Sequence, residues 1–388
     1  LGKLGYKVLI VEKNSFLGGS ITSSLVIPAM KTSENAINNV FFNILYYKLN
    51  KINGASTYID GNKGWFNPEL TKIVLDELMN EANVKILFES KIQNIKEKLL
   101  EYHVTIDTHN IFSANKKLSV PIETKYIVDA TGNAEICKEL NCEFLHDNYK
   151  QPISLRFIMS GINIKKFSDW LINFDSDRNV TTSCISDGQI LLSTAYTWDT
   201  SVNWALKPIF EAGIDEGIIT EEDSNYFQIF SVVGTSDSIA FNCPRILDDK
   251  ISLSDAYIKG RESILRLSQF CKKYFPGFEN AHISSIANTM GIRVSNRVKG
   301  RYVYTSEDLR SGKKFKTPVV ISNYPIDIHS SEKNFSTLEK LYQEYQLPIE
   351  SLIVKDNLFV VGRCISTDFE AQGALRIIPS CFSMGEGL

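Results

Sequence analysis

The most informative segment of this chain is Tyr6-Lys7-Val8-Leu9-Ile10-Val11-Glu12, which is followed by Gly18-Gly19. A run of apolar, β-branched residues that ends in an acid is typical of a buried parallel strand. The terminal carboxylate of such a strand can accept hydrogen bonds from an adenosine ribose. Glu12 is this acid. The alternative, on these residues alone, is an ordinary buried strand that happens to end in Glu.

The residues before this strand indicate its place in a larger unit. Leu1 and Leu4 are spaced as in the last turn of a helix, and Gly5 follows where a left-handed cap is expected. The strand is therefore predicted to be the second of a βαβ unit. In such units the glycine-rich phosphate loop lies roughly 20 residues before the acid, whereas eleven residues precede Glu12. We therefore expect a fragment, with a G-x-G-x-x-G loop upstream of Leu1 and an end inside its last helix.

Length and composition limit the classes of protein to consider. At 388 residues the chain is long enough for two domains. Its net charge of -3 gives no basic field for nucleic acid, and no apolar run approaches the ~20 residues of a membrane-spanning helix. The seven cysteines include no C-x-x-C pair, which argues against a disulfide framework and a metal cage. We expect a cytoplasmic protein that binds no nucleic acid and no metal and has no membrane span.

Periodicity predicts the elements that follow the first strand. A helix is expected to begin at Asn67-Pro68-Glu69, and residues 84–88 form a second short buried-type strand. Residues 91–106 and 122–128 alternate like antiparallel strands, with a polar turn around residues 109–117. This pattern predicts a β-meander inserted in an α/β sheet. The strand that ends at Asp129 continues into Ala130-Thr131-Gly132, where a backbone can approach a ligand closely.

The rest of the chain reads as a β-rich region followed by a return to α/β structure. Residues 151–242 are predicted to be mostly strands and loops, and a long helix runs from Ser254-Asp255 to the break at Pro276-Gly277. A final strand over 357–361 closes on Gly362-Arg363. Pro379 then stands near the first position of a last helix. The amide groups and dipole of such a helix start favour negative charge.

Several of these segments together resemble one family. The matching stretches, in chain order, are Val8-Leu9-Ile10-Val11-Glu12-Lys13 with Phe16-Leu17-Gly18-Gly19, Val128-Asp129-Ala130-Thr131-Gly132, Phe275-Pro276-Gly277-Phe278-Glu279, Gly291 to Arg297, Tyr324 to His329, and Val361 to Ser366 with Arg376 and Met384-Gly385. They are similar to the FAD-dependent oxidoreductases of the glutathione-reductase-like superfamily. The chain departs from the family pattern at Asn133, where Asp is usual, and at Asn296, where a second Arg is common.

The resemblance implies FAD as the cofactor and assigns residues to it. Glu12, with Lys13 beside it, would hold the adenosine ribose, and Gly18 with Gly19 would let backbone amides approach the pyrophosphate and flavin. The remaining residues that it implies for the cofactor are Ser20 and Thr22 at the flavin edge, Ile92 at adenine, Ala130, Thr131 and Gly132 beside the dinucleotide, Gly362 and Arg363 at the ribityl-pyrophosphate region, and Pro379, Ser380 and Cys381 at the start of the last helix.

The resemblance also indicates where chemistry would occur. Arg293, Arg297 and Arg376, together with Arg245, would bind a carboxylate or phosphate substrate over the flavin face. His329 would transfer a proton while the flavin exchanges a hydride, with Asp327 orienting the ring or its loop. The alternative is structural: Arg293 and Arg297, four residues apart, would form a salt-bridged helix face, and His329 would cap a turn.

We therefore expect an α/β protein with a Rossmann-like FAD-binding domain, formed by a parallel sheet with a β-meander, and an inserted β-rich substrate domain. The FAD-binding domain would comprise residues 1–149 and 351–388, and the substrate domain residues 150–350. The expected activity is hydride transfer between FAD and a small, anionic organic substrate. The electron acceptor or donor is left open. Two other functions stay in view: a flavin-carrying electron-transfer subunit, and non-redox use of FAD by a hydratase or isomerase.

Overall fold

β1 (Leu9–Val11) and β4 (Lys85–Leu87) form a parallel pair at the start of the fold. The computed structural model describes residues 1–98, 101–110, 116–147, 149–197, 204–247, 250–329 and 336–388. A short 3-10 turn, η1 (Gly2–Leu4), precedes β1 and ends at Gly5, whose φ is 86°. The turn, the left-handed cap and the parallel strand predicted from the first twelve residues are therefore confirmed.

The connection between β1 and β4 carries two helices that pack on each other. Its elements are η2 (Gly19–Ile21), α1 (Val40–Lys51), β2 (Ala55–Ser56), β3 (Trp65–Phe66) and α2 (Pro68–Glu81). α2 begins where the sequence predicts, because the side chain of Asn67 accepts hydrogen bonds from the backbone N–H groups of Glu69 and Leu70. Leu49 of α1 and Val74 of α2 are buried in one core cluster.

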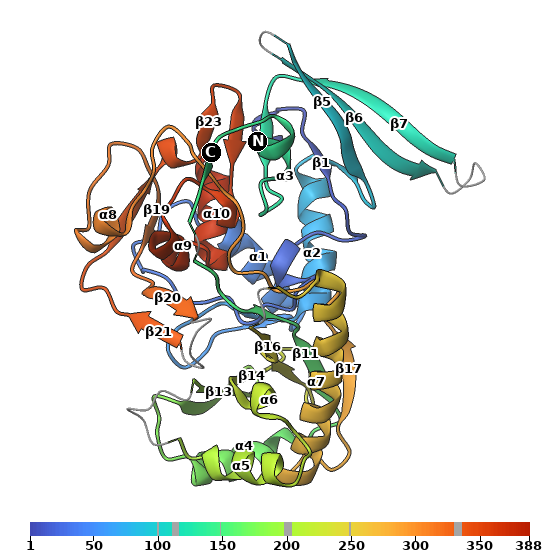
Figure 1. Cartoon of the computed structure of the whole chain (residues 1–388), viewed down its shortest axis with the longest axis vertical. Coiled ribbons are helices and arrows are strands. Elements are labelled where there is room, and N and C mark those ends of the chain that lie inside the picture. The colour runs from blue at the N-terminus through green and yellow to red at the C-terminus, as the bar shows by residue number, and fades with distance from the viewer. Residues whose placement is uncertain (99–100, 111–115, 148, 198–203, 248–249, 330–335) are drawn as a thin grey trace.

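A three-stranded antiparallel meander follows β4. It consists of β5 (Lys91–Lys98), β6 (Glu101–Asn110) and β7 (Lys116–Thr124). Figure 1 shows it extending away from the remainder of the molecule. The predicted meander is thus confirmed, while part of its predicted polar turn, residues 111–115, lies outside the described residues.

A second parallel pair joins segments that are far apart in the sequence. β8 (Ile127–Asp129) pairs with β24 (Leu358–Val360), and β23 (Ile353–Lys355) lies antiparallel on the other side of β24. In this register Asp129 is opposite Val360. The two strands therefore end at the same edge, and the loops after them begin side by side. Beyond β8 lie α3 (Glu135–Glu139) and β9 (Phe144–Leu145), and β9 pairs with β18 (Arg297–Val298).

The middle of the chain is built on a six-stranded antiparallel sheet. Its order is β12 (Thr181–Ser186), β13 (Gln189–Tyr196), β14 (Phe227–Ser231), β15 (Ile239–Phe241), β11 (Phe157–Ser160) and β17 (His282–Ile286). Its helices are α4 (Ile164–Phe174), α5 (Lys207–Asp215), α6 (Glu221–Ser224) and the long α7 (Leu253–Tyr274). β10 (Ile153–Ser154) pairs with β16 (Arg245–Ile246).

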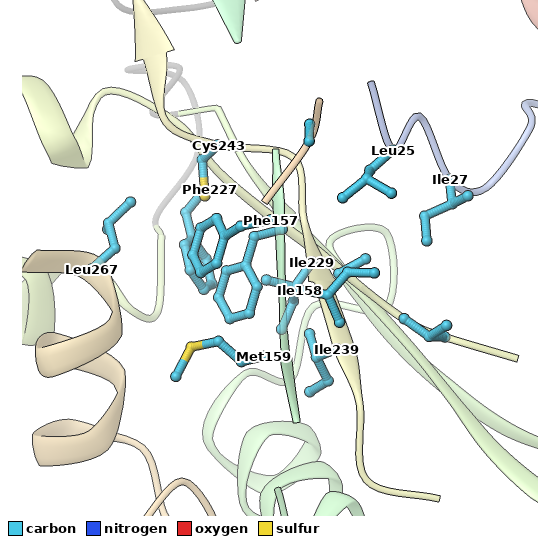
Figure 2. Packing of buried hydrophobic residues seen from close by; sticks show 14 of the residues in the cluster. Leu25, Ile27, Phe157, Ile158, Met159, Phe227, Ile229, Ile239, Cys243 and Leu267 are labelled. Carbon is cyan, nitrogen blue, oxygen red and sulfur yellow. The ribbon is translucent and has the colours of Figure 1, made fainter. Parts of the chain in front are cut away.

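This middle region shares its hydrophobic core with the first segment of the chain. Figure 2 shows Phe157 and Phe227 together, with Leu267 of α7 on one side and Leu25 and Ile27 on the other. All five side chains are buried and belong to a single cluster. The segment after β1 is therefore held against the middle sheet by apolar burial.

The remaining elements surround a second core cluster. They are α8 (Ser306–Arg310), β19 (Pro318–Ser322), β20 (Ile326–His329), β21 (Ser336–Glu339), β22 (Tyr345–Pro348), η3 (Ile349–Ser351), η4 (Gly362–Cys364), α9 (Phe369–Leu375) and α10 (Ile378–Gly387). α10 lies against α1, because the carboxylate of Glu386 accepts hydrogen bonds from the backbone N–H groups of Val40 and Phe41, at distances of 3.3 and 2.8 Å. The last helix thus caps the first.

The expected fold class, parallel α/β pairs with a meander and a β-rich region, is confirmed. One expectation for residues 151–242 was incomplete, because α4 and α5 lie there besides the strands. α4 follows a side-chain cap at Asn163 and buries Phe167 and Leu171 on one face. Its aromatic residues have the intrinsic preference of strands, and tertiary packing outweighs that preference. The boundaries of the two domains stay a prediction.

Candidate functional site

Glu12 extends the ladder of β1 and presents a carboxylate oriented by its own turn. Its backbone N–H donates to the carbonyl of Leu87, and its Oε1 accepts from both the backbone and the side-chain amide of Asn14, at 2.8 and 2.9 Å. In the described part of the chain, its Oε2 accepts no hydrogen bond. Lys13 is exposed. The free carboxylate oxygen can accept from a hydroxyl of a bound ribose.

The start of the meander lies directly beside Glu12. The backbone N–H of Ser90 donates to the carbonyl of Glu12 at 3.0 Å, and Ile92 follows two residues later as a half-buried residue of β5. Ile92 is therefore near the acid, as expected for a residue that contacts adenine.

The Gly18-Gly19 loop has a backbone that other residues would strain. φ is 109° at Gly18 and 53° at Gly19. A Cβ on Gly18 would lie 2.6 Å from Oγ1 of Thr22, whereas a Cβ on Gly19 would meet nothing within 4 Å. The hydroxyl of Thr22 donates to the carbonyl of Leu17 at 2.7 Å and is buried, so here it holds the loop together. Ser20 is exposed. Open space beside Gly19 leaves its backbone accessible to a ligand.

The Ala130-Thr131-Gly132 loop is organised by the acid before it. Asp129 is fully buried, and one carboxylate oxygen accepts from the backbone N–H and hydroxyl of Thr131, at 3.0 and 2.7 Å. The other oxygen accepts from the N–H groups of Ile136 and Cys137, both at 3.0 Å. Four hydrogen bonds to one side chain therefore tie the strand end, the loop and the first turn of α3 into one shape.

Arg363 lies across the same edge of the sheet. Its Nη2 donates to Oδ1 of Asn133 at 2.6 Å, and its Nε donates to the hydroxyl of Ser295, which in turn donates to the carbonyl of Gly132. The guanidinium lies so close to Gly132 that a Cβ there would be 3.0 Å from Nη1. A Cβ on Gly362 would meet nothing within 4 Å. The two loops predicted to bind the dinucleotide are therefore joined by Arg363.

The first turn of α10 closes this edge. Pro379 stands in its first turn. Within the described part of the chain, no side chain caps the helix start at Ile377 and the buried hydroxyl of Ser380 has no hydrogen-bond partner. Burial raises the pKa of the Cys381 thiol to about 11, against the opposing influence of the nearby Arg363 and Arg376. An uncapped helix start with an unpartnered hydroxyl is suited to bind an electron-rich ligand edge.

The loop after β1 and the first turn of α10 lie together. Ile21, which follows Gly18-Gly19, and Ile378 and Phe382 of α10 line one small apolar cavity of about 20 Å³. Phe382 also packs against the rings of Phe41 and Phe42. The segments expected at the two ends of the flavin are therefore neighbours in the fold.

A second group of residues, which we call the arginine cluster, consists of Arg156, Arg245, Arg293 and Arg376. Arg156, Arg245 and Arg293 are 7%, 7% and 5% exposed. Burial and repulsion from the other guanidinium groups lower the pKa of Arg293 well below its usual value. The pKa of Arg156 is lowered to about 10, mainly by burial. Such a concentration of buried positive charge is expected where an anion binds.

Within the arginine cluster, Arg245 lies beside Tyr226 and His329. The guanidinium of Arg245 stacks on the ring of Tyr226, 3.3 Å from its centroid, and its Nη2 lies 2.8 Å from Nδ1 of His329. His329 is 7% exposed, and its backbone N–H donates to the side chain of Gln151 at 3.1 Å. Burial, with the surrounding arginines, lowers the pKa of His329 well below its usual value.

Asp327 is a carboxylate that lies against the arginine cluster. Its Oδ2 lies 3.4 Å from Nη2 of Arg376, 3.6 Å from Nε2 of His329 and 3.4 Å from the hydroxyl of Tyr324. Arg376 also donates to the backbone carbonyl of Asp327, at 3.1 Å. Three of the expected chemical residues, Arg293, His329 and Arg376, are therefore brought together with Arg245 and Asp327 around one point of the fold.

Arg297 lies elsewhere. It pairs with Asp147 and is 2% exposed, and its guanidinium is 5.9 Å from the centre of the Phe369 ring. The segment that contains Arg293 and Arg297 is not helical, and the two side chains do not share a face. The proposed catalytic role of Arg297 stays a prediction, and its contacts are those of a residue that fixes β18.

Gln372 connects the arginine cluster to the cofactor edge. Its Nε2 donates to the backbone carbonyl of Arg293 at 2.9 Å and to that of Arg363 at 3.3 Å. Two carbonyl acceptors fix the orientation of the amide, so its Oε1 must point away from them. This oxygen is buried and has no hydrogen-bond partner among the described residues. It is placed to accept a hydrogen bond from a ligand N–H or O–H group.

Sequence reasoning missed Arg156, Gln151, Gln372 and the role of Asp129. Asp129 carried a signal, since an acid at the end of a strand before small residues resembles Glu12 in its setting. Arg156 and Gln372 lie inside β-rich and helical stretches without a local motif, and only the fold brings them to the site.

The described residues also bear on metal binding and on membrane insertion. Among the residues that the structure describes, no three His, Cys, Asp or Glu side chains gather as a metal site would require. None of the described helices combines the length and the apolar character needed to cross a bilayer.

Comparison with known proteins adds a family. The profile of the family described as FAD dependent oxidoreductase matches residues 1–388. No curated protein sequence gave a significant match. Among solved structures, p-nitrophenol 4-monooxygenase PnpA from Pseudomonas putida is 10% identical with a TM-score of 0.42, over 96% of this chain and 72% of that chain.

Two further structures are similar at the same level. The flavin-dependent halogenase CmlS is 11% identical with a TM-score of 0.47, over 99% of this chain and 53% of the halogenase. A geranylgeranyl bacteriochlorophyll reductase-like protein from Thermoplasma acidophilum is 11% identical with a TM-score of 0.41, over 100% of this chain and 71% of that chain. The chain thus spans about half the length of the halogenase, and identities of this order carry no substrate from one protein to another.

Proposed function

Because the chain belongs to the family of FAD-dependent oxidoreductases, we propose that it transfers a hydride between FAD and a small, anionic organic substrate held by the arginine cluster. The observation that carries this proposal is the burial of Arg293 beside Arg156 and Arg245, at the point where Gln372 links them to the loop of Arg363. Buried guanidinium groups are the usual recognition groups for carboxylates and phosphates.

The residues at the sheet edge fit an FAD molecule. Open space beside Gly19 and Gly362, the free oxygen of Glu12 and the unpartnered hydroxyl of Ser380 supply an accessible backbone, a ribose acceptor and a polar contact. We propose that these residues, with Ala130, Thr131, Gly132, Arg363, Pro379 and Cys381, hold the cofactor. We also propose the wider glutathione-reductase-like superfamily, with residues 1–149 and 351–388 as the FAD-binding domain and 150–350 as the substrate domain.

Bound FAD supplies the acceptor or donor of the hydride. The arginine cluster would hold the acid groups of the substrate and fix its reacting carbon. Water is kept out by the burial of the same residues. Nδ1 of His329 is engaged by Arg245, so a proton that leaves or reaches the substrate would pass through Nε2, on the side of Asp327. A second electron donor or acceptor would reduce or oxidise the flavin to complete the cycle.

To test this, the FAD-loaded protein is mixed anaerobically with a panel of small hydroxy acids and enoic acids, and the visible absorbance of the flavin is measured. We expect one class to bleach or restore this absorbance. Arg293→Ala should slow that reaction on the order of 100-fold, because truncating one partner of a buried charge pair costs several kcal/mol. Arg261→Ala is the matched control, since Arg261 is exposed on α7.

Other outcomes would contradict the proposal. Bleaching by a protein donor alone, with no small acid active, would indicate an electron-transfer subunit. Turnover of an acid without any net change in its oxidation state would indicate a hydratase or isomerase.

A further inference from the structure

Arg156 and Arg293 are two buried cations without a carboxylate partner. Neither forms an ion pair with any acid of the described chain. Arg293 donates through Nη1 to the carbonyl of Pro152 and the hydroxyl of Ser154, at 2.6 and 3.0 Å. Arg156 donates through Nε to the side chain of Asn242, also at 2.6 Å. All of these acceptors are neutral, so the hydrogen bonds orient the two guanidinium groups but leave both positive charges in place.

The other members of the cluster do not remove these charges. Asp327 is the one carboxylate of the cluster within the described residues, and it lies against Arg376 and His329. Its charge is therefore already matched by Arg376. Tyr226 and Tyr324 are kept protonated, because burial raises the pKa of both hydroxyls. Arg376 and Asp327 balance each other, and Arg245 stacks on the ring of Tyr226 with Asp327 among the charges near it. The charges of Arg156 and Arg293 are therefore the least that a bound ligand has to compensate.

The two arginines are close to each other and to a donor that lacks an acceptor. Repulsion from Arg156 is among the causes that lower the pKa of Arg293. A Cβ on Gly291, two residues before Arg293, would lie 2.4 Å from Nη1 of Arg156. Nη2 of Arg293 and Nε2 of Gln151 are both buried, and neither has a hydrogen-bond partner among the residues that the structure describes. Gln151 precedes Pro152, the residue that Arg293 binds. These unpartnered donors require an acceptor that the described residues do not supply.

The cluster also adjoins the proposed flavin site from two directions. Gln372 binds the carbonyl groups of Arg293 and Arg363. On the other side, the hydroxyl of Thr289 lies 2.9 Å from those of Ser23 and Ser24, just after the Gly18-Gly19 loop. A molecule bound by Arg156 and Arg293 is therefore beside the cofactor site, where a substrate must be.

We propose that the substrate of this enzyme is a dianion, a small molecule with two negative charges that Arg156 and Arg293 compensate. This inference rests on the proposed function and narrows its substrate class. A neutral substrate would leave two buried charges unbalanced, and a monoanion would leave one. A dianion is the smallest charge that compensates both Arg156 and Arg293, and burial favours such compensation.

The experiment measures binding to the FAD-loaded protein by isothermal titration calorimetry with three probes: propionate, succinate and inorganic phosphate. The first carries one charge, the second has two separate acid groups, and the third holds its charge on one centre. We expect succinate or phosphate to bind at least about tenfold more tightly than propionate. If succinate binds more tightly than phosphate, the two charges of the substrate are on separate groups; if phosphate binds more tightly, they are on one centre. Equal binding of all three, or tightest binding of propionate, would overturn the proposal.

Variants separate a charge effect from a structural one. Arg156→Gln leaves one uncompensated charge, so the preference for the dianion over propionate should fall about tenfold or more, whereas Arg156→Lys keeps the charge and should keep the preference. Arg293→Gln should repeat the result if Arg156→Gln does not fold, and Arg261→Gln should change nothing. A preference that survives in both Gln variants would overturn the inference. Dianion binding without flavin bleaching would refute the proposed redox function but not this charge assignment.

Discussion

Nδ1 of His329 lies 2.8 Å from Nη2 of Arg245, and this contact fixes which ring nitrogen carries the proton. A guanidinium has only donors, so Nδ1 must be the acceptor and the proton of the neutral ring sits on Nε2. Nε2 faces Asp327 at 3.6 Å. The ring is thus held neutral between a cation and an anion, and Nε2 is the nitrogen that carries its proton.

The neutral state of His329 predicts how stability depends on pH. Its pKa in the folded protein is well below 6.5, because the ring is buried and surrounded by arginines. The unfolded chain takes up a proton near 6.5 that the folded chain does not. The free energy of unfolding should therefore fall as the pH drops below about 6.5, by roughly 1.4 kcal/mol per pH unit from this group. Above that pH the group contributes no pH dependence.

Urea denaturation at several pH values between about 7.5 and about 5.5 checks this. His329→Gln should show a flatter decline than the unmodified protein, by roughly the slope above. His282→Gln is the control, because His282 is an exposed residue of β17, and this variant should keep the original decline. A decline that is identical in all three proteins would contradict the prediction.

Gly18→Ala should disturb the loop after β1. The substitution meets both a strained φ of 109° and a clash with Thr22 at 2.6 Å. Gly188→Ala is a matched control, because φ is 77° there but nothing lies within 4 Å of the added Cβ. The control should lose about 1 kcal/mol from backbone strain alone, and Gly18→Ala about 2 kcal/mol or more. Thermal melts and fluorescence titration with FAD should show the larger loss, and weaker FAD binding, only for Gly18→Ala.

Asp129→Ala should collapse the loop of Ala130-Thr131-Gly132. The change removes a buried acceptor of four hydrogen bonds and leaves the N–H groups of Ile136 and Cys137 unpaired. We expect a loss of about 3 kcal/mol or more in the free energy of unfolding, together with weaker FAD binding. Asp169→Ala, on the exposed face of α4, should cost less than about 0.5 kcal/mol. Similar losses for the two variants in chemical denaturation would refute the assigned role.

Gln372→Met should weaken the link between Arg293 and Arg363. The side chain keeps its volume but loses both donated hydrogen bonds, at a cost of about 2 kcal/mol. Because Oε1 is lost as well, FAD or substrate should bind less tightly by roughly tenfold. Gln343→Met removes one exposed hydrogen bond to the carbonyl of Arg310 and serves as the control. Unchanged ligand affinity in Gln372→Met would show that the amide is only structural.

The sequence predicted the parts of the fold that depend on local patterns. The strand ending at Glu12, the Asn67 cap of α2, the meander and the Pro379 helix start all have signals within a few residues, and all are present. The pairing of β8 with β24 has no local signal, since it joins segments more than 200 residues apart. The resemblance to a family implied only that residues 1–149 and 351–388 belong to one domain, not which strands pair.

The site was predicted less completely than the fold. Arg293, His329 and Arg376 were singled out, and the structure brings them together. Arg297 was singled out with them because it lies in the same family-like segment as Arg293. The structural alternative, a helix face shared by Arg293 and Arg297, is wrong, because a spacing of four places two residues on one face only in a helix and this segment is extended or irregular. Arg156 was missed because its partner across the site, Arg293, is 137 residues away in sequence. Tertiary proximity of this kind leaves no local trace.

The contact between Glu386 and the first turn of α1 couples two distant parts of the molecule. The start of this ten-residue helix is part of the proposed flavin site, and Glu386 near its end binds the backbone N–H groups of Val40 and Phe41. Tightening of that helix on cofactor loading would therefore slow hydrogen exchange of these two amide protons. They form a remote reporter of occupancy that stays readable with a colourless, fully reduced flavin.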